Sequence, residues 1–87
     1  MDNRRYIGDW KNGIIQGKGV FTWPDGNRYE GEYKNGLKHG RGIFYFANGK
    51  VFKGTWEDGK KHGFGQLQID GEIIKGLWNN GELEHAN

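Results

Sequence analysis

Two histidines are the side chains in this sequence that most resemble metal ligands. His39 and His62 each precede a glycine and occupy the same position in two consecutive copies of an internal repeat. The strand pattern described below places them on neighbouring hairpins, so that two strand spacings, about 9 to 10 Å, separate them. Ligands of one zinc ion lie about 2 Å from it, and the sequence has no cysteine to complete a site. His85 lies in a polar C-terminal segment, and we predict no metal site.

Two glycine-flanked cations could in principle cradle a phosphate. Gly17-Lys18-Gly19 and Gly40-Arg41-Gly42 lack the third glycine of a dinucleotide fingerprint and the Lys-Ser/Thr ending of a P-loop. No helical pattern follows either segment to supply a dipole. The repeat itself explains both segments better, so we expect no cofactor and no small-molecule substrate.

Glu30 and Glu32 are the paired carboxylates best placed for acid–base catalysis, because alternate residues of a strand share a face. No histidine partners them, and the sequence contains neither cysteine nor serine as a nucleophile. A solvated pair explains them more simply. The sequence therefore indicates a protein that is not an enzyme.

A basic strip is predicted along the hairpin ends, made of Lys38, His39, Arg41, Lys60, Lys61 and His62. Such a strip is usually a solvated edge. The alternative is contact with anionic phospholipid headgroups, each lysine or arginine contributing about 1 kcal/mol. The candidate lipid contacts are then Lys38, Arg41, Lys60 and Lys61. A net charge of +2 is too small to indicate nucleic acid without a basic face.

The elements that position these residues come from a repeat whose template is Tyr29–Val51. Residues 6–28 and 52–73 align with it, the latter one residue shorter in its last turn, and a fourth copy begins at Ile74 and stops about halfway. All 17 glycines fall at fixed positions of this repeat. A flexible linker would scatter its glycines, so the sequence indicates a repeat array.

Within each copy, apolar residues alternate with polar ones, which is the period of a β-strand. Asn-Gly dipeptides such as Asn12-Gly13 and Asn35-Gly36 favour two-residue hairpin turns, and Asp-Gly or Asn-Gly turns at the other end, such as Asp25-Gly26, lead into the next hairpin. We predict an all-β, elongated antiparallel meander of tandem hairpins with about seven strands. Residues 1–5 form a polar lead-in, 6–81 the array and 82–87 a polar tail.

Large aromatic residues recur on one side of these strands. This aromatic face comprises Tyr6, Trp10, Phe21, Trp23, Tyr29, Tyr33, Phe44, Phe46, Phe52, Trp56 and Trp78. Strand glycines lie between the rings and leave hollows that a ring can cover. The simplest interpretation is that the rings are the core. Because the sequence contains no helix or second sheet to cover them, part of the face should stay accessible to a partner. The partner-binding candidates are Trp10, Phe21, Tyr33, Phe44, Trp56 and Trp78.

The pattern Tyr-x-Gly-x-Trp/Tyr, followed by Asn-Gly or Asp-Gly, a His-Gly-x-Gly element and alternating aromatics, resembles the MORN repeat over residues 6–81. Gln16 departs from the histidine of the other copies, Tyr33 from the tryptophan, and Leu67 and Ile69 from the aromatics. The resemblance implies an elongated sheet used for protein binding, self-association and, in some members, attachment to phospholipid membranes. It also implies assemblies that are cytoskeletal, ciliary or membrane-associated.

These observations lead to a non-enzymatic protein-interaction or scaffold module, a small structural subunit of a larger assembly, as the first hypothesis. The rival is a peripheral phospholipid-binding module that uses the basic strip. The 87 residues show neither a signal peptide nor an apolar membrane span, and the absence of cysteine fits a reducing compartment. We therefore expect a cytoplasmic location, cytoskeletal, ciliary or peripheral to a membrane.

The truncated fourth copy predicts where a partner docks. After Asn80-Gly81 the sequence lacks the glycine pair and the aromatics of the other copies. The strand at 74–78 should then have a partly unpaired outer edge, which is a template for another strand. We expect this edge to meet a partner chain or a second copy, with Trp78 buried there.

Overall fold

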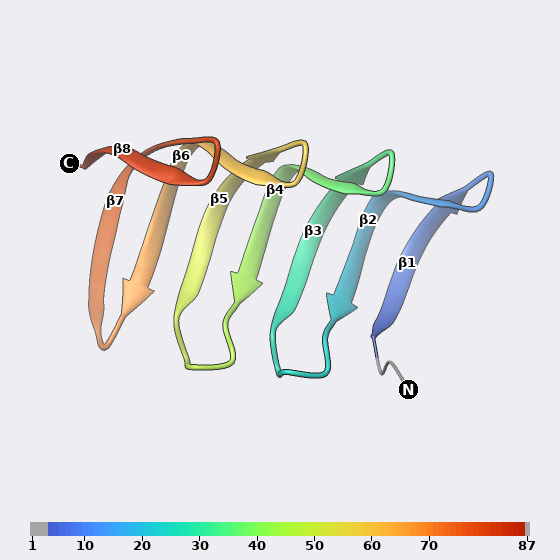
Figure 1. Ribbon diagram of the computed structural model, residues 1–87, viewed down its shortest axis with the longest axis horizontal. Coiled ribbons are helices and arrows are strands. Elements are labelled where there is room, and N and C mark those ends of the chain that lie inside the picture. Colours follow the sequence, from blue (N-terminus) through green and yellow to red (C-terminus); the bar gives the residue numbers. More distant parts are fainter. Residues whose placement is uncertain (1–3, 87) are drawn as a thin grey trace.

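The protein is a single open β-sheet, built from hairpins that stand side by side along the long axis (Figure 1). The structure is a computed structural model that describes residues 4–86. Its strands are β1 (Arg5–Lys11), β2 (Ile14–Thr22), β3 (Arg28–Lys34), β4 (Leu37–Tyr45), β5 (Val51–Glu57), β6 (Lys60–Ile69), β7 (Glu72–Asn79) and β8 (Glu82–Ala86). Each strand pairs antiparallel with the next, so the sheet follows chain order, and its extents are 40 × 23 × 17 Å. The predicted all-β antiparallel meander is confirmed.

The expected number of about seven strands is wrong by one, because β8 forms where we predicted a polar tail. The Asn80-Gly81 turn has φ values of 51° and 92°, the left-handed pair that a two-residue hairpin needs. This turn brings Glu82 opposite Asn79 and Leu83 opposite Trp78. Strand pairing here uses backbone groups and needs neither the glycine pair nor the aromatic residues. The outer edge at this end therefore belongs to β8, and the backbone of β7 is paired on both sides.

Turn chemistry explains the difference in length between the repeats. The loop after β2 has three residues, Pro24-Asp25-Gly26, in which the Trp23 N–H donates to the Asn27 carbonyl and the Gly26 N–H to the Trp23 carbonyl. The third repeat has only Asp70-Gly71 at this place, with both φ values positive. A two-residue turn replaces the three-residue loop, which is the one-residue shortening seen in the sequence.

The strands bend toward the aromatic face. Tyr29 and Tyr33 lie four residues apart on β3, which would separate them by about 13 Å along a straight strand, yet their ring centroids are 5.3 Å apart. The ladder is irregular between Gly31 and Tyr33, and at the matching places in β1 and β5. An irregularity of this kind bends a strand. The aromatic face is therefore concave.

Rings cover a row of directly paired glycines, which confirms the predicted packing of rings over glycine. Gly31 pairs with Gly42 and Gly54 with Gly65. A Cβ atom on Gly65 would lie 2.5 Å from Cζ of Phe52, and a Cβ atom on Gly31 would lie 2.5 Å from backbone atoms of the neighbouring strand. Only glycine leaves room for the ring and for the neighbouring strand.

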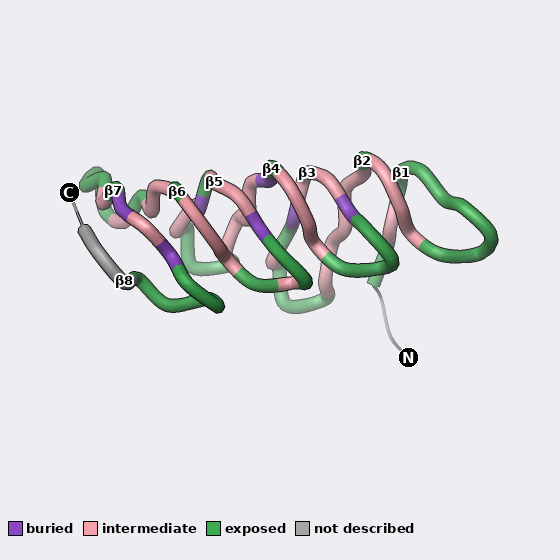
Figure 2. The backbone as a smooth tube through the Cα atoms, turned by 90° about the horizontal axis from the view of Figure 1, so that it is seen from above, coloured by how far each residue is buried: buried purple, intermediate pink, exposed green. Residues whose placement is uncertain are grey.

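The core is a single layer of side chains on the aromatic face. The buried hydrophobic residues come from β3, β5 and β7 and are Tyr29, Tyr33, Phe52, Trp56 and Trp78 (Figure 2). Around them pack the half-buried Tyr6, Ile15, Phe21, Trp23, Phe44, Phe46 and Leu67. No second layer covers this face within the part of the chain that the structure describes. The sheet thus folds its rings against one another instead of against a helix.

Candidate functional site

The aromatic face gathers all six predicted partner-binding residues, but it does not expose them equally. Tyr33 and Trp56 are each 7% exposed and Trp78 is 5% exposed, whereas Trp10 is 58% exposed. Phe21 and Phe44 are half-buried. Trp78 therefore belongs to the core of this chain, which corrects the expectation that a partner is needed to bury it.

A ring of the preceding hairpin packs on each of the three buried binding candidates, Tyr33, Trp56 and Trp78. Tyr6 meets Tyr33 edge-on at 5.5 Å between centroids, and Tyr29 meets Trp56 at 5.4 Å. Phe52 does the same for Trp78 at 4.9 Å. Trp10 lies on β1, the first described strand, and among the described residues no ring of an earlier hairpin packs on it. This position explains why it is the exposed member of the set.

The accessible part of the aromatic face is a continuous row of half-buried rings. Phe21 and Trp23 lie 4.5 Å apart, Trp23 and Phe44 stack at 5.6 Å, and Phe44 and Phe46 lie 4.7 Å apart. These rings come from β2, β4 and the ends of those strands. Trp23 and Phe46 belong to the predicted aromatic face but not to the predicted binding residues, although they alternate with Phe21 and Phe44 and therefore share their row.

Two lysines lie over this face, and neither was predicted to be there. Nζ of Lys38 is 5.5 Å from the ring centroids of Trp23 and Trp56, and 5.7 Å and 5.8 Å from those of Tyr29 and Phe44. Nζ of Lys61 is 5.1 Å from the Phe52 ring and 5.4 Å from the Phe46 ring. Ring faces attract such cations. Burial lowers the pKa of both lysines below the usual value of 10.5.

The basic strip is consequently divided between two faces. Lys38 pairs with Tyr33 and Lys61 with Trp56, so both share the aromatic face. Arg41 precedes Gly42 and lies on the opposite, outer face, and Lys60 precedes Lys61 and also alternates away. Arg41 and Lys60 are exposed, whereas Lys38 and Lys61 are half-buried. The sequence indicates this placement, because Lys38 and Lys61 occupy the repeat position that apolar Ile15 holds in the first repeat.

The carboxylates Glu30 and Glu32 have partners within the repeat. Glu30 forms an ion pair with Arg28, and Oε2 of Glu32 accepts the backbone N–H of Arg41 at 2.7 Å. Glu32 therefore links β3 to β4, whereas Glu30 is paired along its own strand.

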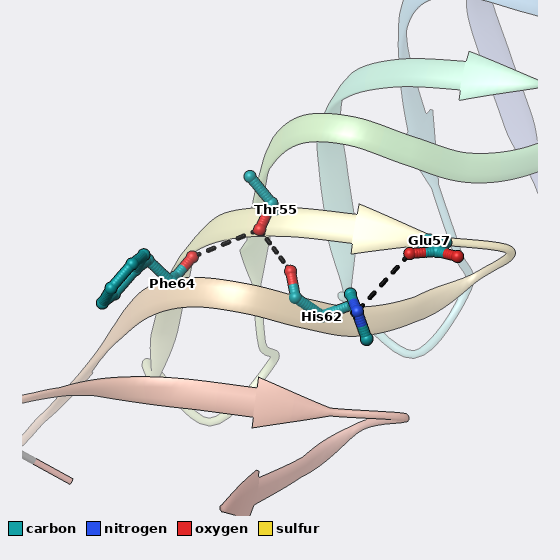
Figure 3. Close-up of polar contacts among 4 residues, drawn as sticks. All are labelled: Thr55, Glu57, His62 and Phe64. Atoms are coloured by element: carbon teal, nitrogen blue, oxygen red, sulfur yellow. Dashed lines mark hydrogen bonds and ion pairs between the residues drawn. The ribbon is translucent and has the colours of Figure 1, made fainter. Parts of the chain in front are cut away.

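In the third repeat, Thr55 occupies the position that Glu32 holds in the second. Its hydroxyl donates to the carbonyls of His62 and Phe64 (Figure 3). Nε2 of His62 lies 3.5 Å from Oε2 of Glu57. Gln16 occupies the position of His62 in the first repeat, and its side-chain oxygen accepts the N–H of Asn35 at 3.1 Å. Gln16 and His62 thus both lie beside hairpin turns. Among the described residues, no group of three or more His, Asp and Glu side chains gathers as a metal site would require.

The outer face is a mixed surface. Its exposed apolar residues include Ile7 and Phe64, 70% and 69% exposed, and a shallow hollow over the paired glycines is lined by Ile43, Phe64 and Lys53. No described helix has the length and hydropathy of a membrane span.

Comparison with family models identifies three consecutive copies of the MORN repeat, at residues 6–28, 29–51 and 52–71. A search of curated proteins finds no match. MORN repeats are non-enzymatic modules that bind proteins and membranes. Each match is one hairpin, made of β1 and β2, β3 and β4, or β5 and β6. The hairpin of β7 and β8 continues the same sheet beyond them. The chain therefore belongs to the MORN-repeat family.

Proposed function

We propose that this chain is a protein-interaction module that works as a structural subunit of a larger assembly, and that its aromatic face is the binding surface. The observation that carries the proposal is the row formed by Phe21, Trp23, Phe44 and Phe46, half-buried and uncovered by any described segment. Aromatic residues anchor protein interfaces because they bury large areas with little loss of conformational freedom. The exposed Trp10 ring lies on the same face and meets Tyr6 edge-on at 5.3 Å, and Tyr6 lies 6.1 Å from Phe21 of the row.

A pair of matched variants tests which face binds. Trp10→Ala removes a 58% exposed ring from the aromatic face, and Phe64→Ala removes a 69% exposed ring from the outer face. Both changes touch exposed side chains, so both variants should fold, which circular dichroism checks. Affinity purification from the native cell, with co-purifying chains quantified by mass spectrometry, should show loss of the partner with Trp10→Ala and its retention with Phe64→Ala. The reverse pattern would move the interface to the outer face.

Binding to anionic phospholipid is the competing function, and the division of the cations argues against it. At most two of Lys38, Arg41, Lys60 and Lys61 can face one membrane, so the predicted strip itself contributes about 2 kcal/mol at about 1 kcal/mol for each residue. Flotation with vesicles that contain anionic lipid, at low and physiological salt, separates the two functions. Stable flotation at physiological salt would favour the membrane.

A further inference from the structure

One position of the hairpin forms a column across the aromatic face. Ile15 pairs with Trp10, Lys38 with Tyr33, Lys61 with Trp56 and Leu83 with Trp78, each opposite the equivalent aromatic residue of its own hairpin. The column therefore reads apolar, cation, cation, apolar along the long axis of the sheet. Ile15 is half-buried and Leu83 is 44% exposed, so the column lies at the surface of the face.

Among the described residues, the two cations of this column have no anionic partner. No carboxylate of the described residues forms an ion pair with either lysine. The carboxylates of Glu30, Glu32 and Glu57 are engaged elsewhere. Half-buried ammonium groups lose hydration, and ring faces replace only part of it. The aromatic face thus has apolar surface with two cations that lack a counter-charge.

The spacing of the column identifies the kind of segment that fits it. Equivalent residues of adjacent hairpins are two strand spacings apart, about 9 to 10 Å. Residues i and i+7 of an α-helix lie on one side of the helix and about 10.5 Å apart. In an extended strand the matching separation is three residues, and residues three apart point to opposite faces. A helix can therefore follow the column, and a strand cannot.

We propose that the aromatic face binds an amphipathic helix of a partner protein that carries two carboxylates at i+7 and i+14, flanked by apolar residues at i and i+21. The carboxylates meet Lys38 and Lys61, and the apolar residues meet Ile15 and Leu83. Such a helix is about 32 Å long at 1.5 Å per residue, within the 40 Å length of the sheet. This inference rests on the proposed function, because it assigns the chemistry of the partner to the same face.

Synthetic peptides test the register directly. The probe is an alanine-based helix of about 22 residues with glutamate at positions 8 and 15 and leucine at the other positions of that stripe. A control peptide of the same composition has its glutamates at positions 6 and 13, where the helix turns them to the opposite side. Calorimetry with the full chain should give tighter binding of the first peptide by about tenfold, the effect of about 1.4 kcal/mol. Equal affinity for the two peptides would overturn the proposal.

Matched lysine variants locate the contact. Lys38→Met with Lys61→Met removes both charges and keeps apolar stems, and Lys53→Met with Lys75→Met makes the same change in net charge on exposed lysines of the outer face. Only the first pair should weaken binding of the glutamate peptide, by about tenfold or more. Lys38→Glu with Lys61→Glu should instead bind a peptide with lysine at positions 8 and 15.

The remaining outcomes separate this inference from the proposed function. If the native partner is retained by Lys38→Met with Lys61→Met but lost with Trp10→Ala, the acidic helix is wrong and the proposed function stands. If the lysine variants abolish flotation with anionic vesicles and leave peptide binding unchanged, the two cations serve a lipid surface and the proposal fails.

Discussion

The glycines at the centre of the strands are required for space as well as for conformation. Gly31 and Gly42 lie under the Tyr29 ring, and a Cβ atom on Gly31 would meet the Arg41 carbonyl at 2.5 Å. Because that atom belongs to the neighbouring strand, no side-chain movement relieves the contact. At Gly36 glycine is favoured for conformation, because φ is 81° and a Cβ atom would have only an ordinary van der Waals contact with Ile14, at 3.8 Å.

We therefore predict that Gly31→Val destabilises the protein by about 1 to 3 kcal/mol through overpacking, although valine has the better strand propensity. For a domain of this size, that loss lowers the melting temperature by about 4 °C or more. Lys53→Val, on the outer face of β5, should change stability by less than about 0.5 kcal/mol. A melting temperature that is unchanged or raised by Gly31→Val would contradict the packing argument.

The tyrosines of the aromatic face make stability sensitive to alkaline pH. Burial raises the pKa of the Tyr29 and Tyr33 hydroxyls above the usual 10.0. A group whose pKa is higher in the folded state contributes full stability below its unfolded pKa and loses that contribution as pH rises above it. Unfolding should therefore become easier above about pH 10. The depressed lysine pKa values act in the opposite direction, because deprotonation removes the penalty on a desolvated charge.

Tyr29→Phe separates the tyrosine effect from the lysine effect. Phe52 holds the equivalent place in the next repeat, so the ring fits without its hydroxyl. The variant loses the hydrogen bond from the Tyr29 hydroxyl to the Glu32 carbonyl, 3.1 Å long, and should lose about 0.5 to 1.5 kcal/mol near pH 7. Urea midpoints at pH 8 and pH 11 should fall less for Tyr29→Phe than for the unmodified chain. An equal fall would assign the alkaline loss to other groups.

At the level of strands and turns, the sequence predicted what short-range chemistry determines. The Asn-Gly pairs specified two-residue turns, and period-two alternation specified the hairpins and the aromatic face. The prediction missed β8 because it required side-chain signals from a strand that backbone pairing alone holds. It also placed Lys38 and Lys61 on a common strip with Arg41, although alternation puts Lys38 on the face of Gly42 and Phe44 and puts Arg41 on the other face. What alternation does not show is the irregular pairing between Gly31 and Tyr33, which turns the end of the hairpin.

The C-terminal hairpin separates a role in folding from a role in assembly. Trp78 packs on Phe52 and is 5% exposed, so Trp78→Ala should cost about 3 to 5 kcal/mol and loosen this end of the core. Removal of residues 82–87 leaves Trp78 in place and exposes the edge of β7. If a partner strand docks on the β8 edge, the truncated chain should stay folded and lose the native complex in co-purification and light scattering. Retention of the complex by the truncated chain would exclude the β8 edge, and would leave as the interface the part of the aromatic face that precedes Leu83.

The whole molecule behaves as a one-dimensional array, because each hairpin contacts only its neighbours. The β2–β3, β4–β5 and β6–β7 ladders join successive repeats. Further backbone hydrogen bonds join them at the hairpin turns, where the N–H groups of Gly36, Gly59 and Gly81 donate to the carbonyls of Ile15, Lys38 and Lys61, each at 2.9 Å. Rings cross the same boundaries from Tyr6 to Tyr33 and from Tyr29 to Trp56. Among the described strands, the middle repeats have neighbours on both sides, whereas the repeat of β1 and β2 has one.

This asymmetry predicts the order in which the sheet opens. Tyr29 and Phe52 in the middle are 0% exposed, whereas Trp10 is 58% exposed and none of β1 is buried. Burial of one more large side chain contributes about 1.5 to 3 kcal/mol, so local opening of β1 and β2 should need less free energy than opening of β4 and β5 by at least that amount. Native-state hydrogen exchange should then show protection factors at least about tenfold lower in the β1–β2 ladder than in the β4–β5 ladder. Trp10→Ala should hardly change either set, because the exposed ring contributes little. Uniform protection across all ladders would mean that the array unfolds as one cooperative unit, with coupling between repeats stronger than the difference in burial.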